Sequence, residues 1–242
     1  YRITAEALEA AVSDKTKLLI INYPNNPTGQ ILTEADIQAL TVFLRKHPDI
    51  YVLSDEIYEK IVYDQKQIIS LASIPEFFDR VVIVNGFSKC SAMTGWRLGY
   101  LACNTAMYQV VLKLFQHSIS CTSGFLQRGA LTAMDCVEET EQMRQAYEKR
   151  KNLLVKGIHE IPGVELLTPA GAFYAWVKFD TDMDSETLCN DLLDKAKIAG
   201  VPGIAYGEED CVCIRFSFAA SEDVLRTMLE RLKTYQTTHN DL

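Results

Sequence analysis

The stretch Val81-Val-Ile-Val-Asn-Gly-Phe-Ser-Lys89 places four apolar residues directly before a polar run. Two earlier stretches have the same form: Lys17-Leu-Leu-Ile-Ile-Asn22 and Tyr51-Val-Leu-Ser-Asp55. Apolar runs that are continuous rather than alternating are typical of strands covered on both faces of a sheet. We therefore expect three strands of one parallel sheet, each of which ends in polar residues.

The segments around these runs predict helices. Thr33, followed three residues later by Asp36, has the form of a helix N-cap, and Ile37, Leu40, Phe43 and Leu44 then supply an apolar stripe. We expect another helix over residues 4–11 and a fourth strand over 98–103. Strand–helix–strand repetition of this kind favours an α/β fold with right-handed crossovers and a mostly parallel sheet flanked by helices.

The pattern changes after residue 104, which predicts a second, smaller α+β domain. We place the division between residues 1–140 and residues 141–242. The elements expected in this part are helices over 104–117, 137–160, 185–197 and 221–235, and strands over 172–179 and 212–218.

Composition excludes several classes of protein. The 242 residues carry a net charge of −8 and contain no block of Lys or Arg, which disfavours nucleic acid as a partner. The longest apolar runs have the length of strands, so we expect no membrane span. The seven cysteines show no CxxC or Cys/His metal spacing, and we interpret them as reduced thiols of a cytoplasmic protein that binds no metal.

Chemistry-bearing side chains follow the ends of the predicted strands, where ligands bind in open parallel sheets. Lys89 follows one strand, and a partly desolvated lysine there is competent for Schiff-base chemistry; a solvated loop lysine is the commoner alternative. Asp55 ends another strand and suits a protonated heterocyclic nitrogen, although a helix cap is the commoner role for such a residue taken alone. Tyr58 comes one helical turn later.

Two arginines are candidates for anion binding. Arg97 lies among small residues, so that the backbone can pass close to an anion held by Arg97 and Ser88. Arg215 alternates with apolar residues in a predicted strand, and its planar fork suits a carboxylate. An ordinary salt bridge is the alternative for both.

Four segments together resemble the signature set of class I/II aminotransferases, which are pyridoxal-phosphate enzymes of fold type I. They are Asn25-Asn-Pro-Thr-Gly29, Asp55-Glu-Ile-Tyr58, Gly86-Phe-Ser-Lys89 and Met93-Thr-Gly-Trp-Arg-Leu-Gly99. Further similarity covers residues 169–173, 201–207 and 214–217, so the resemblance extends over the whole chain in order. The branch it most resembles contains the aspartate- and aromatic-type enzymes.

The resemblance implies a role for each residue that matches a motif. It implies that Lys89 forms the Schiff base with pyridoxal 5′-phosphate and then acts as the general base. Asp55 would pair with the ring nitrogen, Tyr58 and Asn26 would bind the phenolic oxygen of the cofactor, and Asn26 would also lie at the substrate. Ser88 and Arg97 would bind the phosphate, and Arg215 would bind the substrate carboxylate. Asn26–Pro27 is a candidate cis peptide bond.

Three departures from the family pattern stand out. Gly86 occupies a position where many relatives have Ser or Thr, and Tyr206 stands where Phe is commoner, a change for which we expect little consequence. The chain also lacks the N-terminal portion of the family, with its phosphate-binding loop and the aromatic ring that stacks on the cofactor. Residues 1–140 would therefore be the C-terminal part of the large cofactor-binding domain. We expect this piece alone to bind cofactor poorly and to aggregate.

The function that follows is transfer of an amino group between an α-amino acid and a 2-oxo acid, coupled to glutamate and 2-oxoglutarate, by a cytoplasmic homodimer. A pyridoxal-phosphate β-lyase on the same scaffold is one alternative. A ligand-sensing domain of a transcriptional regulator, or an inactive homologue with a structural role, is another. Release of pyruvate from cysteine-type substrates without an amino acceptor would distinguish the lyase from the aminotransferase. A basic winged-helix segment upstream would identify the regulator.

Overall fold

The computed structural model describes residues 2–240, which form two compact units. The first unit contains the chain up to Pro24 together with Ile31–Glu141. The second contains Asn25–Gln30 together with the chain from Gln142 onward. The second unit is therefore built from two separate segments of the sequence.

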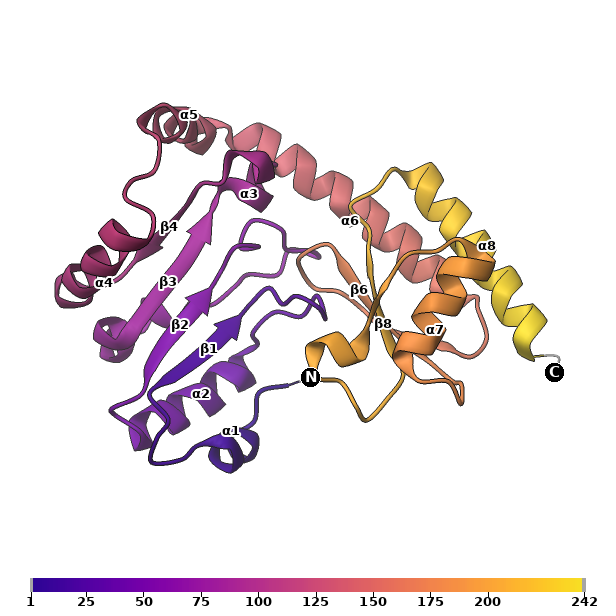
Figure 1. Ribbon diagram of the computed structural model, residues 1–242, viewed down its shortest axis with the longest axis horizontal. Helices are drawn as coiled ribbons and strands as arrows, with labels where there is room; N and C mark the ends of the chain where they lie inside the picture. The colour runs from indigo at the N-terminus through magenta and orange to yellow at the C-terminus, as the bar shows by residue number, and fades with distance from the viewer. Residues whose placement is uncertain (1, 241–242) are drawn as a thin grey trace. The chain divides into compact units, whose positions relative to one another are not determined.

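A four-stranded sheet forms the centre of the first unit, in the order β1-β2-β3-β4 (Figure 1). The parallel strands are β1 (Leu18–Asn22), β2 (Tyr51–Asp55) and β3 (Val81–Gly86), as predicted. The fourth strand, β4 (Gly99–Ala102), runs antiparallel to β3. The segment between β3 and β4 contains only short helical turns, and the strands it joins are neighbours in the sheet.

Helix α2 (Glu34–Lys46) shows how the sequence builds the core of this unit. The side chain of Thr33 accepts a hydrogen bond from the backbone of Asp36, and Asp36 accepts one from the backbone of Thr33, which completes the predicted capping box. The apolar stripe of the helix packs on the sheet in a buried cluster that includes Ile21, Leu40, Phe43, Leu44 and Val52.

The other helical elements of the first unit are mostly short. They are α1 (Ala5–Ala11), η1 (Leu71–Ser73), η2 (Pro75–Arg80), α3 (Phe87–Cys90), η3 (Thr94–Trp96), α4 (Thr105–Ser118) and α5 (Gly124–Asp135). The sequence pattern did not predict α5, because Gly129 lies in its interior and glycine is a poor helix former. The glycine has a packing reason: a Cβ at Gly129 would lie 2.6 Å from the ring of Trp96.

One side of the first unit leaves apolar side chains uncovered. All four residues of β4 are exposed, and α4 has no buried residue. Val110 and Leu114 of α4 are 60% and 67% exposed. Neither element therefore has its apolar face covered within the described part of the chain.

The second unit contains an antiparallel sheet in the order β5-β6-β8-β7. Its strands are β5 (Val164–Leu167), β6 (Tyr174–Phe179), β8 (Cys213–Ser217) and β7 (Val201–Pro202). The helical elements are α6 (Val137–His159), which begins in the first unit, α7 (Ser185–Asp191), the π-helical turn η4 (Leu192–Ala196), η5 (Gly203–Tyr206) and α8 (Glu222–Asn240). The sequence pattern predicted β6, β8 and the long helices but missed the short edge strands β5 and β7.

The segment Asn25–Gln30 is bound tightly to the rest of the second unit. The carbonyl of Gly29 accepts hydrogen bonds from the backbone N–H groups of Ala170 and Gly171, both at 2.8 Å. Gly29 has a φ of +68°, and a Cβ there would lie 2.7 Å from Cβ of Pro169, so only glycine fits. The predicted cis peptide bond Asn26–Pro27 is present, and Tyr23–Pro24 is also cis.

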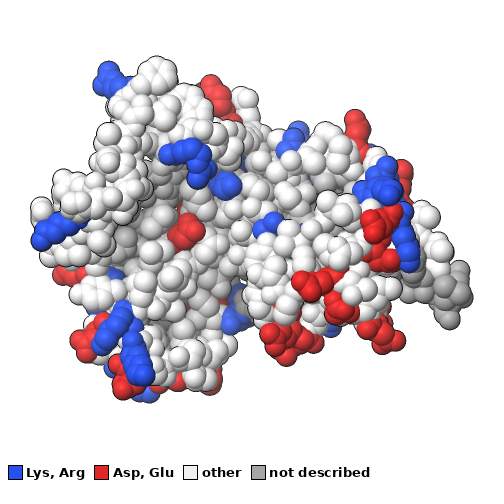
Figure 2. All heavy atoms as spheres, in the orientation of Figure 1, with Lys and Arg blue, Asp and Glu red and all other residues white. Residues whose placement is uncertain are grey.

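Charged side chains of both signs are scattered over the face shown in Figure 2. No helix among residues 2–240 combines the length and apolar character needed to cross a membrane. The same residues contain no group of three or more His, Cys, Asp or Glu side chains that could hold a metal ion.

Candidate active site

Asp55 lies at the end of β2, where its backbone pairs with Asn22 of β1 and Val84 of β3. The backbone N–H of Ile57 donates to Asp55 Oδ1 at 3.2 Å, which begins a turn. Burial raises the pKa of the Asp55 carboxyl, and hydrogen bonds from Ile57 and Asn22 lower it in part. No cation among the described residues contributes, so this half-buried carboxylate can accept one.

The turn that follows β2 positions Tyr58. The backbone N–H of Glu56 donates to the carbonyl of Val84 at 2.9 Å, which holds the turn against β3. Tyr58 is 4% exposed, and Lys89 Nζ lies 6.0 Å from the centre of its ring. The structure therefore brings Tyr58 and Lys89 together, although they are far apart in the sequence.

Lys89 and Ser88 are half-buried residues of the short helix α3, which begins directly after β3 ends at Gly86. Gly86 pairs with Gly99 of β4. A Cβ on Gly86 would lie 2.8 Å from Cα of Gly99 and 2.9 Å from the carbonyl oxygen of Leu98. The departure from Ser or Thr at this position thus has a physical reason, because the two backbones leave no space for a side chain.

Arg97 follows η3 and precedes β4, in the same unit as Lys89. Its backbone is left-handed, with a φ of +54°, and its side chain is exposed. Arg97 Nη1 donates to the carbonyl of Thr94 at 3.1 Å. The structure therefore places both members of the predicted anion-binding pair, Ser88 and Arg97, in the first unit.

Arg215 lies in β8 of the second unit, opposite Trp176 of β6 and Val201 of β7. Its Nη1 donates to Asn26 Oδ1 at 2.7 Å, so two of the predicted site residues are in direct contact. Its Cζ lies 4.5 Å from the ring centre of Tyr174 and 5.2 Å from that of Tyr206.

The guanidinium of Arg215 retains an unsatisfied donor. Its Nε is buried and has no hydrogen-bond partner among residues 2–240. Buried donors are rarely left unpaired, and a planar fork held beside aromatic rings matches a carboxylate. The arrangement is therefore suited to a carboxylate ligand.

Sequence reasoning missed one of the two aromatic neighbours of Arg215 and undervalued the other. Tyr174 is paired with Ser217 across the sheet, which makes it a diagonal neighbour of Arg215. Tyr206 seemed an inconsequential replacement of Phe, yet its ring contacts the guanidinium. The contacts of both tyrosines with Arg215 depend on the register of β6, β7 and β8, and residue patterns alone do not reveal that register.

Comparison with known proteins now identifies the family. The family model described as aminotransferase class I and II matches residues 1–232. The chain belongs to this family. It is 40% identical over 235 residues to the aspartate aminotransferase of Musicola paradisiaca, covering 96% of this chain and 58% of that aminotransferase. It is 37% identical to aromatic-amino-acid aminotransferase 2 of Thermococcus litoralis, covering 96% and 60% of the two chains.

Solved aminotransferase structures confirm the fold. The crystal structure of the aromatic aminotransferase from Pyrococcus horikoshii matches all of this chain and 65% of that chain, with a TM-score of 0.95 and 35% identity. The predicted fold class, a partial fold type I transferase with a smaller α+β part, is thereby confirmed. The chain spans about three fifths of the length of these aminotransferases.

Class I and II aminotransferases depend on pyridoxal 5′-phosphate, and the residues described above fit that cofactor. The half-buried Asp55 carboxylate, whose pKa no cation in the described part of the chain lowers, suits a protonated pyridine nitrogen. The amine of Lys89, near the ring of Tyr58, suits the aldehyde. The buried Nε of Arg215 suits the carboxylate of an amino acid.

Proposed function

We propose that the protein transfers an amino group between an α-amino acid and a 2-oxo acid, with pyridoxal phosphate bound through Lys89. The observation that carries the proposal is the placement of Asp55 at the end of β2 and of Lys89 in α3, which directly follows the adjacent strand β3. Family membership supports the same reaction class.

The cofactor residues of the first unit have separate tasks in this proposal. When bound, the pyridinium ring of the cofactor accepts the electron pair left on the substrate Cα after its proton is removed. Asp55 would keep the ring nitrogen protonated by accepting its hydrogen bond, which a half-buried carboxylate whose pKa no cation among the described residues lowers is suited to do. Tyr58 donates to the phenolic oxygen. Ser88 and Arg97 bind the phosphate.

Lys89 acts twice. Its amine would hold the cofactor at its aldehyde carbon. Once free, the same amine would remove the proton from the substrate Cα as a general base. Tyr58, whose ring lies near Lys89 Nζ, is suited to hold this amine in place.

Arg215 and Asn26 provide substrate binding in the second unit. Arg215 binds the α-carboxylate, which satisfies its buried Nε. Asn26, through its 2.7 Å contact with Arg215 Nη1, fixes the orientation of the guanidinium. We propose that Asn26 also donates its amide N–H to the phenolic oxygen of the cofactor.

The names of the relatives support the finer assignment. Aspartate and aromatic amino acids are the proposed donors, because relatives of both types match the chain. The acceptor that we propose is 2-oxoglutarate, as the family resemblance implies. We further propose a homodimer in the cytoplasm.

The test uses the complete polypeptide supplied with pyridoxal phosphate. The wild type is expected to transfer the amino group of aspartate to 2-oxoglutarate, and borohydride reduction is expected to fix the cofactor on Lys89. Lys89→Ala should abolish both results, while the exposed Lys60→Ala should change neither. Undiminished transfer by Lys89→Ala, or release of pyruvate from cysteine without an acceptor, would contradict the proposal.

A further inference from the structure

Two thiols of the second unit lie closer together than their spacing in the sequence would suggest. Cys211 and Cys213 are separated by one residue, and their Sγ atoms are 3.1 Å apart. Residues i and i+2 of an extended strand share a face but stand well apart along it. Here the backbone bends at Cys211, just before β8 begins, and the bend brings the two sulfurs into contact.

The two thiols differ in their freedom to move. Cys213 is 1% exposed and is paired with Lys178 of β6. A Cβ on Gly203 would lie 3.2 Å from Cβ of Cys213, so the backbone of η5 packs against it. Cys211 lies outside the strand, is half-buried, and lines an open hollow of roughly 800 Å³ together with Asp210 and Lys178.

We propose that Cys211 and Cys213 form an oxidative modification site, in which a peroxide converts the dithiol into an intrachain disulfide. A disulfide requires an S–S distance of about 2.05 Å, so Cys211 has to move by roughly 1 Å. The half-exposed residue outside the strand can make this movement while Cys213 stays in the sheet.

The chemistry balances with hydrogen peroxide as the oxidant. The Cys211 thiolate attacks one peroxide oxygen, the O–O bond breaks, and water leaves, which gives a sulfenic acid. Cys213 Sγ then attacks the Cys211 sulfur, the S–S bond forms, the S–O bond breaks, and a second water leaves. Two thiols are oxidised and one peroxide is reduced to two waters. The buried Cys213 protects the sulfenic acid from further oxidation by reacting with it at once.

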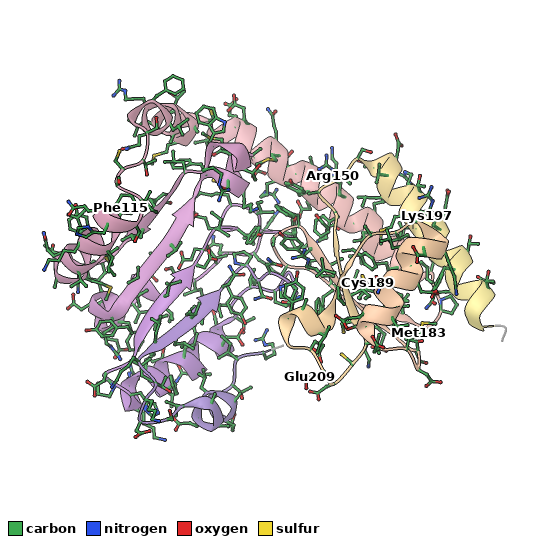
Figure 3. The ribbon with its side chains drawn as sticks, viewed as in Figure 1. Phe115, Arg150, Met183, Cys189, Lys197 and Glu209 are labelled. Atoms are coloured by element: carbon green, nitrogen blue, oxygen red, sulfur yellow. The ribbon has the colours of Figure 1, made fainter. Side chains whose placement is uncertain are left out.

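Proteolysis offers a direct readout on the complete, reduced polypeptide. Trypsin releases residues 198–215, which contain only these two cysteines, and residues 179–195, which contain only Cys189. Cys189 is also half-buried in the second unit and donates to the carbonyl of Gly200, so it is a matched control thiol (labelled in Figure 3). After stoichiometric hydrogen peroxide and alkylation, peptide 198–215 should have lost two hydrogens and carry no alkyl group, whereas Cys189 should be alkylated.

Two variants separate the steps. Cys213→Ser should retain the sulfenic acid on Cys211, where dimedone adds to it, and Cys211→Ser should leave Cys213 fully alkylated. Dithiothreitol should restore both thiols of the wild type. Alkylation of both cysteines in peptide 198–215 after peroxide treatment would overturn the proposal, as would oxygen addition to Cys211 without a disulfide.

Discussion

Asp55 combines a cost in stability with a proposed role in cofactor binding. Because burial raises the pKa of its carboxyl in the folded state, the folded chain binds a proton at Asp55 more tightly than the unfolded chain does. The ionised form therefore lowers the free energy of unfolding at pH values above the raised pKa. This penalty disappears as the pH falls through the pKa of the folded state.

Replacing Asp55 by Asn removes the buried charge and keeps an acceptor for the N–H of Ile57. In cofactor-free protein, Asp55→Asn is expected to raise the free energy of unfolding at mildly alkaline pH, and the gain should shrink as the pH falls. Urea unfolding at a series of pH values, from mildly alkaline to acid, measures this gain in the free energy of unfolding. The exposed Asp49→Asn serves as the control and should show no such trend. A gain that grows toward acid pH would contradict the assignment.

The contact between Arg215 and Asn26 makes a second prediction at this scale. Arg215→Lys keeps the positive charge but loses the planar fork, so KM for the amino acid should rise on the order of tenfold. Asn26→Ala should change KM in the same direction, because Arg215 Nη1 loses its acceptor. Steady-state kinetics on the complete polypeptide test both, with the exposed Arg231→Lys as control. An unchanged KM in both variants would remove Arg215 from substrate binding.

Individual residues differed in how far they could be predicted from the sequence. Asp55 and Lys89 were open to prediction, because an apolar run fixes the end of a strand and a ligand binds beyond it. Tyr174 was not, because its contact with Arg215 depends on which residues of β6 and β8 lie side by side. The roles of all these residues remain predictions that the experiments above test.

Helix α2 is the element whose local sequence agrees best with its structure. Two reciprocal hydrogen bonds join Thr33 and Asp36 at its N-terminus, whereas Thr4 of α1 accepts a single one from Ala7. Thr33→Ala is expected to lower the free energy of unfolding by about 1 kcal/mol. Chemical denaturation measures the loss. Thr4→Ala should cost less, and an equal or larger loss there would contradict this account.

Elements were predictable where several signals agreed and were missed where only one was present. Helix α2 has a cap, an apolar stripe and basic residues in its last turn. Helix α5 has an interior glycine whose purpose is contact with Trp96, and that contact is visible only in the folded chain. Strands β5 and β7 are short edge strands, for which the alternation of burial is too brief to recognise.

At the scale of the whole molecule, the uncovered face of α4 and β4 is the feature expected to affect self-association most. When the 242-residue chain is produced alone, these apolar side chains are expected to drive self-association. Leu114→Glu should reduce light scattering at a given concentration. It should change stability by no more than about 0.5 kcal/mol, because the residue is largely exposed.

A matched variant distinguishes this face from exposed apolar residues in general. Val224 of α8 is 57% exposed in the second unit, and Val224→Glu should leave the scattering unchanged. Equal effects of the two substitutions would show that net charge, rather than the face of α4, controls association.

The family and the fold class were open to prediction because the motifs occur in order along the chain, and the comparisons confirm both. The set of chain segments that forms the second unit could not be predicted. The segment Asn25–Gln30 lies between a strand and a helix of the first unit, and only its contacts with Ala170 and Gly171 assign it to the second.

That assignment has a consequence for dissecting the molecule. A protein cut to residues 142–242 would lack the carbonyl of Gly29, and two backbone donors at Ala170 and Gly171 would lose their acceptor. Arg215 would lose Asn26 at the same time. A synthetic peptide spanning Asn25–Gln30 would then be a ligand for the cut protein, and its binding would measure in trans what the intact chain holds together covalently.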